Sequence, residues 1–381
     1  MAAPRIRLGM VGGGRGAFIG AVHRIASRID DKYELVAGAL SSNPENAKAS
    51  AEDLLIAPER SYASYEEMFK AELAREDGIE AVAIVTPNHM HFPVAKAALE
   101  AGINVICDKP VTRTLEEALE LEQLVKKSDS FFALTHNYSG YPLVRYAREM
   151  VERGDLGNIR LVQVEYPQEW LTEAQGDDNK QASWRTDPAR SGAGGCLGDI
   201  GTHAFQLARF ISGQKVSAVC ADLTAFVPGR QVDDNVHVMM RFENGAKGML
   251  WTSQVAPGCE NGLRVRIYGD KAGLEWAQET PNELWLTPLF GHHQRITRRN
   301  DNIDSDIAAR GIRIPQGHPE GYLEGFATVY SDIAEVLQAK RDGKKADIES
   351  WIPGIETGVE GLKFISAVIA SSEADSRWTA L

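Results

Sequence analysis

The stretch 81–110 limits the fold of this chain more than any other part of the sequence. It begins with a short apolar run, 81–85, and continues to a second one, 104–107; both predict strands buried on two faces. Between them, apolar residues recur at helical spacing from His89 to Ala101, and Gly102 stands where a helix commonly ends. A strand, a helix and a second strand predict one unit of a parallel sheet.

Two polar side chains follow the ends of these strands. Asn88 lies in the turn after the first strand, and Lys109 lies in Asp108-Lys109-Pro110 after the second. Ligands of open parallel sheets bind outside the carboxyl ends of the strands, so we expect both side chains to point at one site. The alternative for Lys109, a surface lysine beside a proline, fits this position less well.

Size and charge restrict the class of protein. A length of 381 residues predicts two domains, and 43% hydrophobic and 25% charged residues are typical of a globular protein. A net charge of −12 without a basic cluster argues against nucleic acid and membrane partners. Four scattered cysteines predict reduced thiols in a cytoplasmic protein. We expect no metal, because the pair His292-His293 has no third ligand at a suitable spacing.

A glycine-rich turn near the start indicates a nucleotide site. The predicted strand 6–11 leads into the pattern G-x-G-x-x-A at Gly12, Gly14 and Ala17, and a helix is predicted from there to Ile29. Gly12 permits a tight turn, Gly14 permits close approach of a pyrophosphate, and Ala17 lets helix and strand pack closely. The helix N-terminus then faces the phosphates, which predicts dinucleotide binding.

Strands and helices alternate through the first 137 residues. This rhythm predicts a doubly wound parallel sheet, and therefore an NAD(P)-binding Rossmann domain over residues 1–137. Five strands are expected, at 6–11, 33–40, 81–85, 104–107 and 131–135.

The second part, residues 138–381, has a different pattern. Alternating apolar and polar residues predict an α+β domain with a large, mostly antiparallel open sheet. Helices are expected on one face, and a second copy of the chain on the other. We therefore predict a homo-oligomer, a dimer or tetramer, formed through this C-terminal sheet.

The choice between NAD and NADP rests on the end of the second strand. An acidic residue there would bind the ribose 2′-hydroxyl of NAD, but this chain has Ser41-Ser42-Asn43. The serines also suit the start of a helix at Pro44, which is the simpler interpretation. Arg15 in the glycine turn is able to reach either a ribose or a phosphate. Both cofactors stay open, with NAD favoured for a catabolic sugar oxidation.

A second chemical cluster lies in the C-terminal part. After a glycine-rich approach, Asp199 and His203 stand four residues apart and would share one face of a helix. The alternative is that Asp199 caps the helix and His203 is a polar face residue. Trp184 and Arg185 either hold a polyol by stacking and hydrogen bonds or anchor a loop.

In this order the motifs resemble those of the glucose–fructose oxidoreductase / inositol dehydrogenase (Gfo/Idh/MocA) family, over almost the whole chain. The resemblance rests on Thr86-Pro87-Asn88 with His91, on Asp108-Lys109-Pro110, and on Gly198-Asp199 with His203. It departs from the family where Asp108 replaces the usual glutamate and where Ser41 replaces the usual acid. The resemblance implies NAD(P)-dependent hydride transfer at a secondary hydroxyl or keto group of a sugar, glycoside or inositol-like cyclitol.

The resemblance also implies roles for particular residues. Lys109, Asp199 and His203 form the expected catalytic set: His203 moves the hydroxyl proton, Asp199 contacts the hydroxyl or orients His203, and Lys109 polarises the reacting oxygen. The expected cofactor contacts are Gly12, Gly14, Arg15, Ala17, Phe18, Ser41, Ser42, Thr86, Asn88, His91, Asp108 and Lys109. The expected substrate contacts are Lys109, Tyr138, Trp184, Arg185, Asp199, His203 and His318.

Two other functions compete with a dehydrogenase. One is a glycoside-cleaving enzyme that retains NAD and uses transient oxidation. The other is a cofactor-binding regulator without turnover, against which the joint presence of Lys109, Asp199 and His203 argues.

Overall fold

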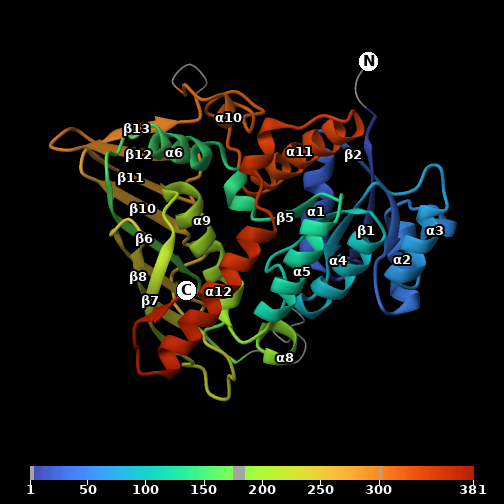
Figure 1. Ribbon diagram of the computed structural model, residues 1–381, viewed down its shortest axis with the longest axis horizontal. Coiled ribbons are helices and arrows are strands. Elements are labelled where there is room, and N and C mark those ends of the chain that lie inside the picture. Colours follow the sequence, from blue (N-terminus) through green and yellow to red (C-terminus); the bar gives the residue numbers. More distant parts are fainter. Residues whose placement is uncertain (1–3, 175–184, 300–302) are drawn as a thin grey trace. The chain divides into compact units, whose positions relative to one another are not determined.

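The computed structural model describes residues 4–174, 185–299 and 303–381 (Figure 1). The chain forms two compact units. The first comprises Met1–Asn137 and Phe326–Val359, and the second comprises Tyr138–Gly325 and Glu360–Leu381. A boundary drawn at residue 137 alone does not include this return of the chain to the first unit.

The first unit is built on a five-stranded parallel sheet. Its strand order is β2-β1-β3-β4-β5, which confirms the doubly wound sheet. All five side chains of β3 are buried, as its continuous apolar run predicts. The strands are β1 (Ile6–Gly12), β2 (Tyr33–Ala39), β3 (Ala81–Val85), β4 (Asn104–Cys107) and β5 (Phe132–Leu134).

Local sequence signals explain where the helices of this unit begin. The side chains of Asn43, Ser64 and Thr114 each accept a hydrogen bond from a backbone N–H in the first turn of the helix that follows. Glu117 completes a capping box with Thr114. The helices are α1 (Phe18–Ile29), α2 (Pro44–Asp53), α3 (Tyr65–Leu73), α4 (His91–Glu100) and α5 (Leu115–Lys127).

The second unit contains a nine-stranded sheet. Its order is β13-β12-β11-β10-β6-β9-β8-β7-β14, and every neighbouring pair is antiparallel except β6 with β9. This confirms the mostly antiparallel sheet. Its strands are β6 (Ile159–Pro167), β7 (Val216–Thr224), β8 (Asn235–Phe242), β9 (Lys247–Ser253), β10 (Arg264–Gly269), β11 (Ala272–Ala277), β12 (Glu283–Pro288), β13 (Gln294–Thr297) and β14 (Thr379–Ala380).

Helices pack on one face of this sheet. Helix α9 contacts β6, β9 and β10, and α6 contacts β11 and β12 (Figure 1). In α9, the ring of Phe205 stacks on that of Phe364 in α12, with centroids 4.0 Å apart. The remaining helices are α6 (Pro142–Glu152), α8 (Pro188–Ser191), α9 (Thr202–Ser212), α10 (Asp306–Ala309), α11 (Tyr322–Arg341) and α12 (Ile355–Glu373); the boundary between the units falls within α11 and within α12.

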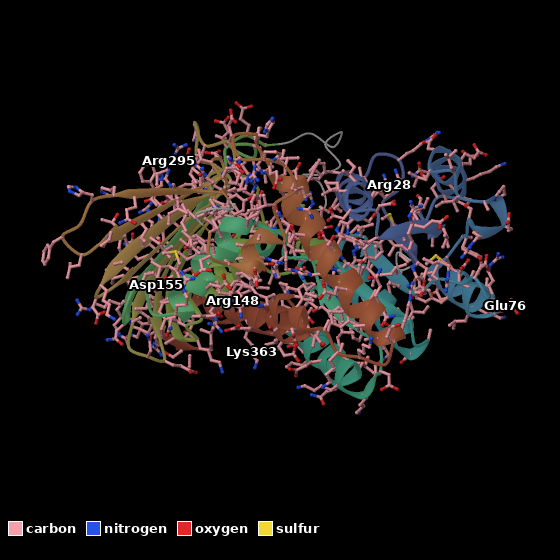
Figure 2. The ribbon with its side chains drawn as sticks, turned by 90° about the horizontal axis from the view of Figure 1, so that it is seen from above. Arg28, Glu76, Arg148, Asp155, Arg295 and Lys363 are labelled. Carbon is pink, nitrogen blue, oxygen red and sulfur yellow. The ribbon has the colours of Figure 1, made fainter. Side chains whose placement is uncertain are left out.

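The burial of alternate side chains shows that one face of the large sheet is covered and the other is exposed. In β8, Val236, Val238 and Met240 are buried, whereas Met239 between them is 50% exposed. Charged side chains project from the outside of both units, among them Arg28 and Glu76 of the first (Figure 2). None of the helices in the described residues is long and apolar enough to cross a membrane.

Candidate functional site

The glycine turn of the first unit has the geometry of a phosphate cradle. Strand β1 ends at Gly12, where φ is +82°, and Gly13 follows with φ of +75°. These values lie in the left-handed region that favours glycine. Ala17 is the N-cap of α1 and makes no side-chain capping hydrogen bond, so the first N–H groups of the helix are left for a ligand. The residues present therefore fit a dinucleotide pyrophosphate.

The closest packing at this turn occurs at Gly20. A Cβ atom on Gly20 would lie 2.4 Å from the Cα atom of Gly13. This contact lies three residues after Ala17, whose own role in helix–strand packing stays a prediction. Gly14 has its own constraint, because a Cβ there would lie 2.7 Å from the carbonyl oxygen of Leu40, at the end of β2.

Polar groups surround the same turn. Arg15 forms two hydrogen bonds with Asp53 of α2, from Nε to Oδ2 (2.6 Å) and from Nη2 to Oδ1 (2.7 Å). The Oγ of Ser41 accepts from the backbone N–H of Asn43 and from Nδ2 of Asn46, both at 3.2 Å. Ser42 is exposed, and Phe18 at the start of α1 is 60% exposed. Their contacts with a cofactor stay predictions.

The end of β4 carries a buried network that the sequence analysis does not contain. Oδ1 of Asp108 accepts a hydrogen bond from Oγ1 of Thr135 (2.9 Å) and lies 3.4 Å from Nε2 of His23. Nδ1 of His23 is 2.7 Å from the hydroxyl of Tyr330 in α11. Burial by itself would raise the pKa of Asp108, but the hydrogen bond with His23 and nearby positive charges, including Lys109, hold it well below its usual range. Asp108 is therefore a charged anchor beside Lys109.

Two histidines lie close to this anchor. Both ring nitrogens of the buried His91 face carbonyl oxygens, Nδ1 that of Pro110 (2.7 Å) and Nε2 that of Thr86 (2.9 Å). His91 thus links the turns that follow β3 and β4, and its contact with the cofactor stays a prediction. Burial, reinforced by the charge of Lys109, lowers the pKa of His136 to about 3, so its imidazole is neutral near pH 7. Lys109 itself is half-buried, as is Thr86, whereas Asn88 is buried.

In the second unit, Asp199 lies in a π-helical turn, Leu197–Gly201, that runs directly into α9. A different aspartate holds the start of this segment. The two carboxylate oxygens of Asp233 accept hydrogen bonds from the backbone N–H groups of Gly195 (2.7 Å) and Leu197 (2.8 Å). Asp199 is not at a cap position, because it lies inside the π-helical turn, whose N-cap is Cys196, and the N-cap of α9 is Gly201. Single π-turns of this kind are frequent at functional sites.

Side chains hold the carboxylate of Asp199. Its Oδ2 accepts hydrogen bonds from Nε of Arg185 (3.2 Å) and from Nε2 of Gln254 (2.9 Å). The side chain of Asp199 keeps 16% exposure and that of Arg185 keeps 21%. Arg185 thus orients Asp199, a role the sequence analysis does not assign to it. Trp184, its predicted partner, lies outside the described residues.

His203 is surrounded by aromatic rings. It is buried in α9, and its ring meets that of Tyr138 edge-on, with centroids 5.0 Å apart. The hydroxyl of Tyr138 is 2.7 Å from that of Tyr166, which donates to Oδ1 of Asn261 at 2.7 Å. Burial, together with the charge of Asp199, raises the pKa of Tyr166, so its hydroxyl stays protonated. The second unit therefore brings together Tyr138, Arg185, Asp199 and His203.

Several members of this cluster are absent from the sequence analysis. They are Tyr166, Gln168 and Asn261, which share one hydrogen-bond network, and Gln254. The alternation Tyr166-x-Gln168-x-Trp170 is a local signal for the first two, whereas Asn261 and Gln254 lie outside it. The predicted substrate contact His318 is exposed, and its Nδ1 lies 3.2 Å from the carbonyl oxygen of Pro315.

Comparison with known families identifies both parts of the chain. Residues 6–136 match the model of an oxidoreductase family with an NAD-binding Rossmann fold, and residues 144–275 match the GFO/IDH/MocA C-terminal domain. The chain belongs to the Gfo/Idh/MocA family. It is accordingly an NAD-binding oxidoreductase, as the sequence motifs predict. Within the described residues, no group of three His, Cys, Asp or Glu side chains is placed to hold a metal ion.

Individual relatives cover most or all of the chain. A crystal structure of an oxidoreductase from Sinorhizobium meliloti is 54% identical, with a TM-score of 0.90 and 99% of both chains covered. The structure of an inositol dehydrogenase homolog from Azotobacter vinelandii, in complex with NADH and myo-inositol, is 33% identical, with a TM-score of 0.92, covering 100% of this chain and 98% of that one. The levoglucosan dehydrogenase of Pseudarthrobacter phenanthrenivorans is 31% identical over 302 residues, 73% of this chain and 75% of its own.

Proposed function

We propose that this protein is a dehydrogenase that transfers a hydride between NAD and a secondary hydroxyl group of a cyclitol or sugar. The observation that carries the proposal is the Asp199 carboxylate, oriented by Arg185 and Gln254 and followed four residues later by the buried His203. The fold adds support, since β4 ends next to Lys109 in an NAD-binding domain. The relatives with myo-inositol and levoglucosan in their names favour a ring-shaped polyol.

In this proposal the protein side chains position the substrate and move its proton. Nicotinamide, when bound, supplies the hydride acceptor or donor. His203 accepts the hydroxyl proton at a ring nitrogen during oxidation and returns it during reduction, as an imidazole does well near neutral pH. Asp199 binds the substrate hydroxyl, while Lys109 provides positive charge for the oxygen as negative charge develops on it.

The surroundings of His203 suit a polyol. The buried rings of Tyr138 and Tyr166 pack against the ring of His203 and hold it in place. The amides of Gln168 and Asn261 and the tyrosine hydroxyls form one polar network able to read the hydroxyl pattern. Since a site built to bind hydroxyls rejects analogues that lack them, we expect deoxy sugars to be poor substrates.

The test is reduction of NAD or NADP, in separate cells, with myo-inositol, other cyclitols, levoglucosan and aldoses. Lys109→Met should lower turnover by at least about 100-fold, the usual loss on removing one electrostatic stabiliser. Lys96→Met is a matched control, because Lys96 is an exposed lysine that pairs with Glu120 on the surface. Normal turnover by Lys109→Met would refute the assignment. Release of an aglycone without net cofactor reduction would show that the protein is the glycoside-cleaving enzyme and not a dehydrogenase.

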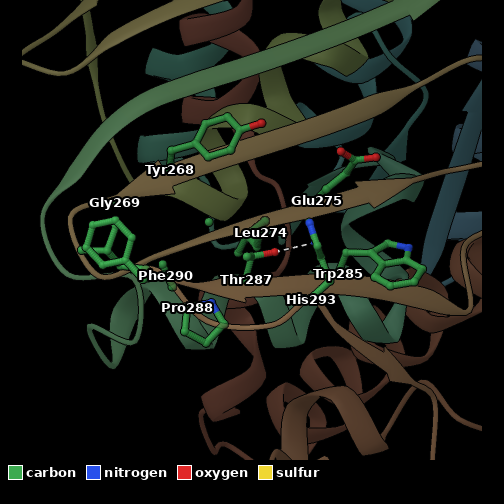
Figure 3. A pocket seen from close by; sticks show the side chains of 12 residues that line it. Tyr268, Gly269, Leu274, Glu275, Trp285, Thr287, Pro288, Phe290 and His293 are labelled. Atoms are coloured by element: carbon green, nitrogen blue, oxygen red, sulfur yellow. Dashed lines mark hydrogen bonds between the residues drawn. The ribbon is translucent and has the colours of Figure 1, made fainter.

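We also propose that the open face of the large sheet joins copies of the chain. Met239 of β8 and Met249 of β9 lie opposite each other on this face and are 50% and 58% exposed. Beyond β10 the same sheet carries a cavity of about 540 Å³, with Tyr268, Trp285 and the fully exposed Phe290 in its wall (Figure 3). Apolar surface of this kind marks protein–protein contacts. Met249→Glu should shift a dimer or tetramer to smaller species in light scattering, whereas an unchanged mass would refute the interface.

A further inference from the structure

We propose that Asp53 determines cofactor choice: by pairing with Arg15 it withholds the guanidinium from the 2′-phosphate of NADP and so favours NAD. This inference deepens the proposed function and rests on it for the class of cofactor. It concerns the adenosine end of the site, where the acidic residue typical of NAD-binding Rossmann domains is missing and Ser41 stands instead.

The backbone of the glycine turn places Arg15 beside the end of β2. The backbone N–H of Gly14 donates to the carbonyl oxygen of Leu40 (3.0 Å), so the glycine turn lies against the end of β2. The next N–H, that of Arg15, donates to Oγ of Ser50 in α2 (2.9 Å). In Rossmann domains the adenosine ribose binds at the end of the second strand, and an arginine nearby accommodates a 2′-phosphate. Arg15 is thus anchored by its backbone at the position where it would meet this phosphate.

The side chain of Arg15 is paired with Asp53. Asp53 accepts from both Nε and Nη2 of Arg15, which uses one edge of the guanidinium in a two-pronged contact. The pair is reachable by a ligand, since the side chains are 55% and 51% exposed. The hydrogen bond and charge of Asp53 raise the pKa of Arg15, and those of Arg15 lower the pKa of Asp53, so both are charged near pH 7.

The pair affects the two cofactors differently. A 2′-phosphate must compete with Asp53 for the guanidinium, and even after displacement the carboxylate stays near a group of the same charge. The ribose diol of NAD is uncharged and meets neither penalty. The Arg15–Asp53 pair therefore discriminates by disfavouring NADP, whereas the usual acidic residue discriminates by binding the ribose of NAD. The serines at 41 and 42 then need not distinguish the cofactors themselves.

The experiment measures dissociation constants of NADH and NADPH by fluorescence titration of the full chain at low ionic strength, without substrate. Asp53→Asn should tighten NADPH binding by about tenfold, because a repelling charge is removed and Arg15 is released, and should change NADH binding by less than about twofold. Glu52→Gln is the matched control: it removes the same charge from the neighbouring position of α2 and should give less than about a third of the effect.

The double variant Arg15→Ala, Asp53→Asn should lose the gain for NADPH, since it removes the guanidinium that the single variant releases. Unchanged NADPH binding by Asp53→Asn would overturn the inference. So would an equal shift for both cofactors, which would mean that Asp53 only supports the turn. Because no substrate is present, a failure of the dehydrogenase assay leaves this result intact. Failure of the parent and all variants to bind either nucleotide would overturn the proposed function and this inference together.

Discussion

Replacement of Gly20 by alanine tests whether the cofactor turn depends on contact between backbones. Gly20 is the third residue of α1. A side chain at this position would point at the backbone of Gly13 in the turn after β1. The added methyl group would lie 2.4 Å from the Cα of Gly13 and 3.0 Å from its carbonyl oxygen. Both neighbours are backbone atoms, so no flexible side chain is able to move aside. The N-terminus of α1 must then separate from the turn.

The expected magnitude is a balance of two effects. Alanine is the better helix former and would gain roughly 1 kcal/mol over glycine in a helix interior. Overpacking a tight contact costs roughly 1–3 kcal/mol, and the short distances at Gly20 place this variant at the upper end. We therefore expect Gly20→Ala to lose about 1–2 kcal/mol of unfolding free energy. NADH affinity should fall by at least about tenfold, because the phosphate-facing N–H groups move with the helix.

Urea denaturation measures the first quantity, and NADH fluorescence titration measures the second. Gly361→Ala provides the matched control. It makes the same change inside α12, where the new Cβ would meet the nearest atom, Oγ1 of Thr202, at an ordinary 3.7 Å. That variant should be neutral or stabilising. If Gly20→Ala binds NADH as tightly as the parent and is equally stable, the reasoning about this contact is refuted.

Three further perturbations address the buried polar groups. The pKa of His136, lowered by burial from 6.5 to about 3, means that the unfolded chain takes up a proton first as pH falls. Stability should therefore drop between these pH values in urea titrations, and His136→Asn should reduce that slope; an unchanged slope would contradict the assignment. Glu72→Gln should cost roughly 1–3 kcal/mol in the same assay, because it removes the buried carboxylate beside Arg60 and leaves that guanidinium only the more exposed Asp77 as a charged partner. Gln254→Leu should reduce turnover by about tenfold or more while NADH binding stays unchanged, since Asp199 loses one of its donors; normal kinetics would remove Gln254 from the site.

Much of the fold was predictable because its strands carry their own signal. Residues 81–85 form a continuous apolar run, and all five are buried in the centre of the first sheet. Strands β13 and β14 escape prediction for the opposite reason. Gln294–Thr297 is short and largely polar, and its conformation comes from pairing with β12 at the sheet edge. The return of Phe326–Val359 to the first unit likewise depends on tertiary packing.

For the candidate site, the residues at fixed spacing were predictable and their partners were not. Motif spacing indicates Asp108, yet its link to His23 joins positions 85 residues apart. The donor Gln254 similarly lies 55 residues from Asp199. Such pairings join residues that only the folded chain brings together, so no local sequence pattern indicates them. The two carbonyl partners of His91 likewise come from the folded arrangement of neighbouring turns and not from its motif.

Asp199 and Asp233 show what separates a structural carboxylate from one able to act on a ligand. By residue type alone the two aspartates do not differ. Asp233 gives both of its oxygens to backbone N–H groups and is only 8% exposed, so it is committed to the fold. Asp199 takes its donors from side chains and keeps 16% of its own side chain exposed. When the donors are side chains, the carboxylate is held in one orientation, and no backbone N–H group depends on it for a hydrogen bond. Of the two, Asp199 is therefore the one whose loss should reduce activity more than stability.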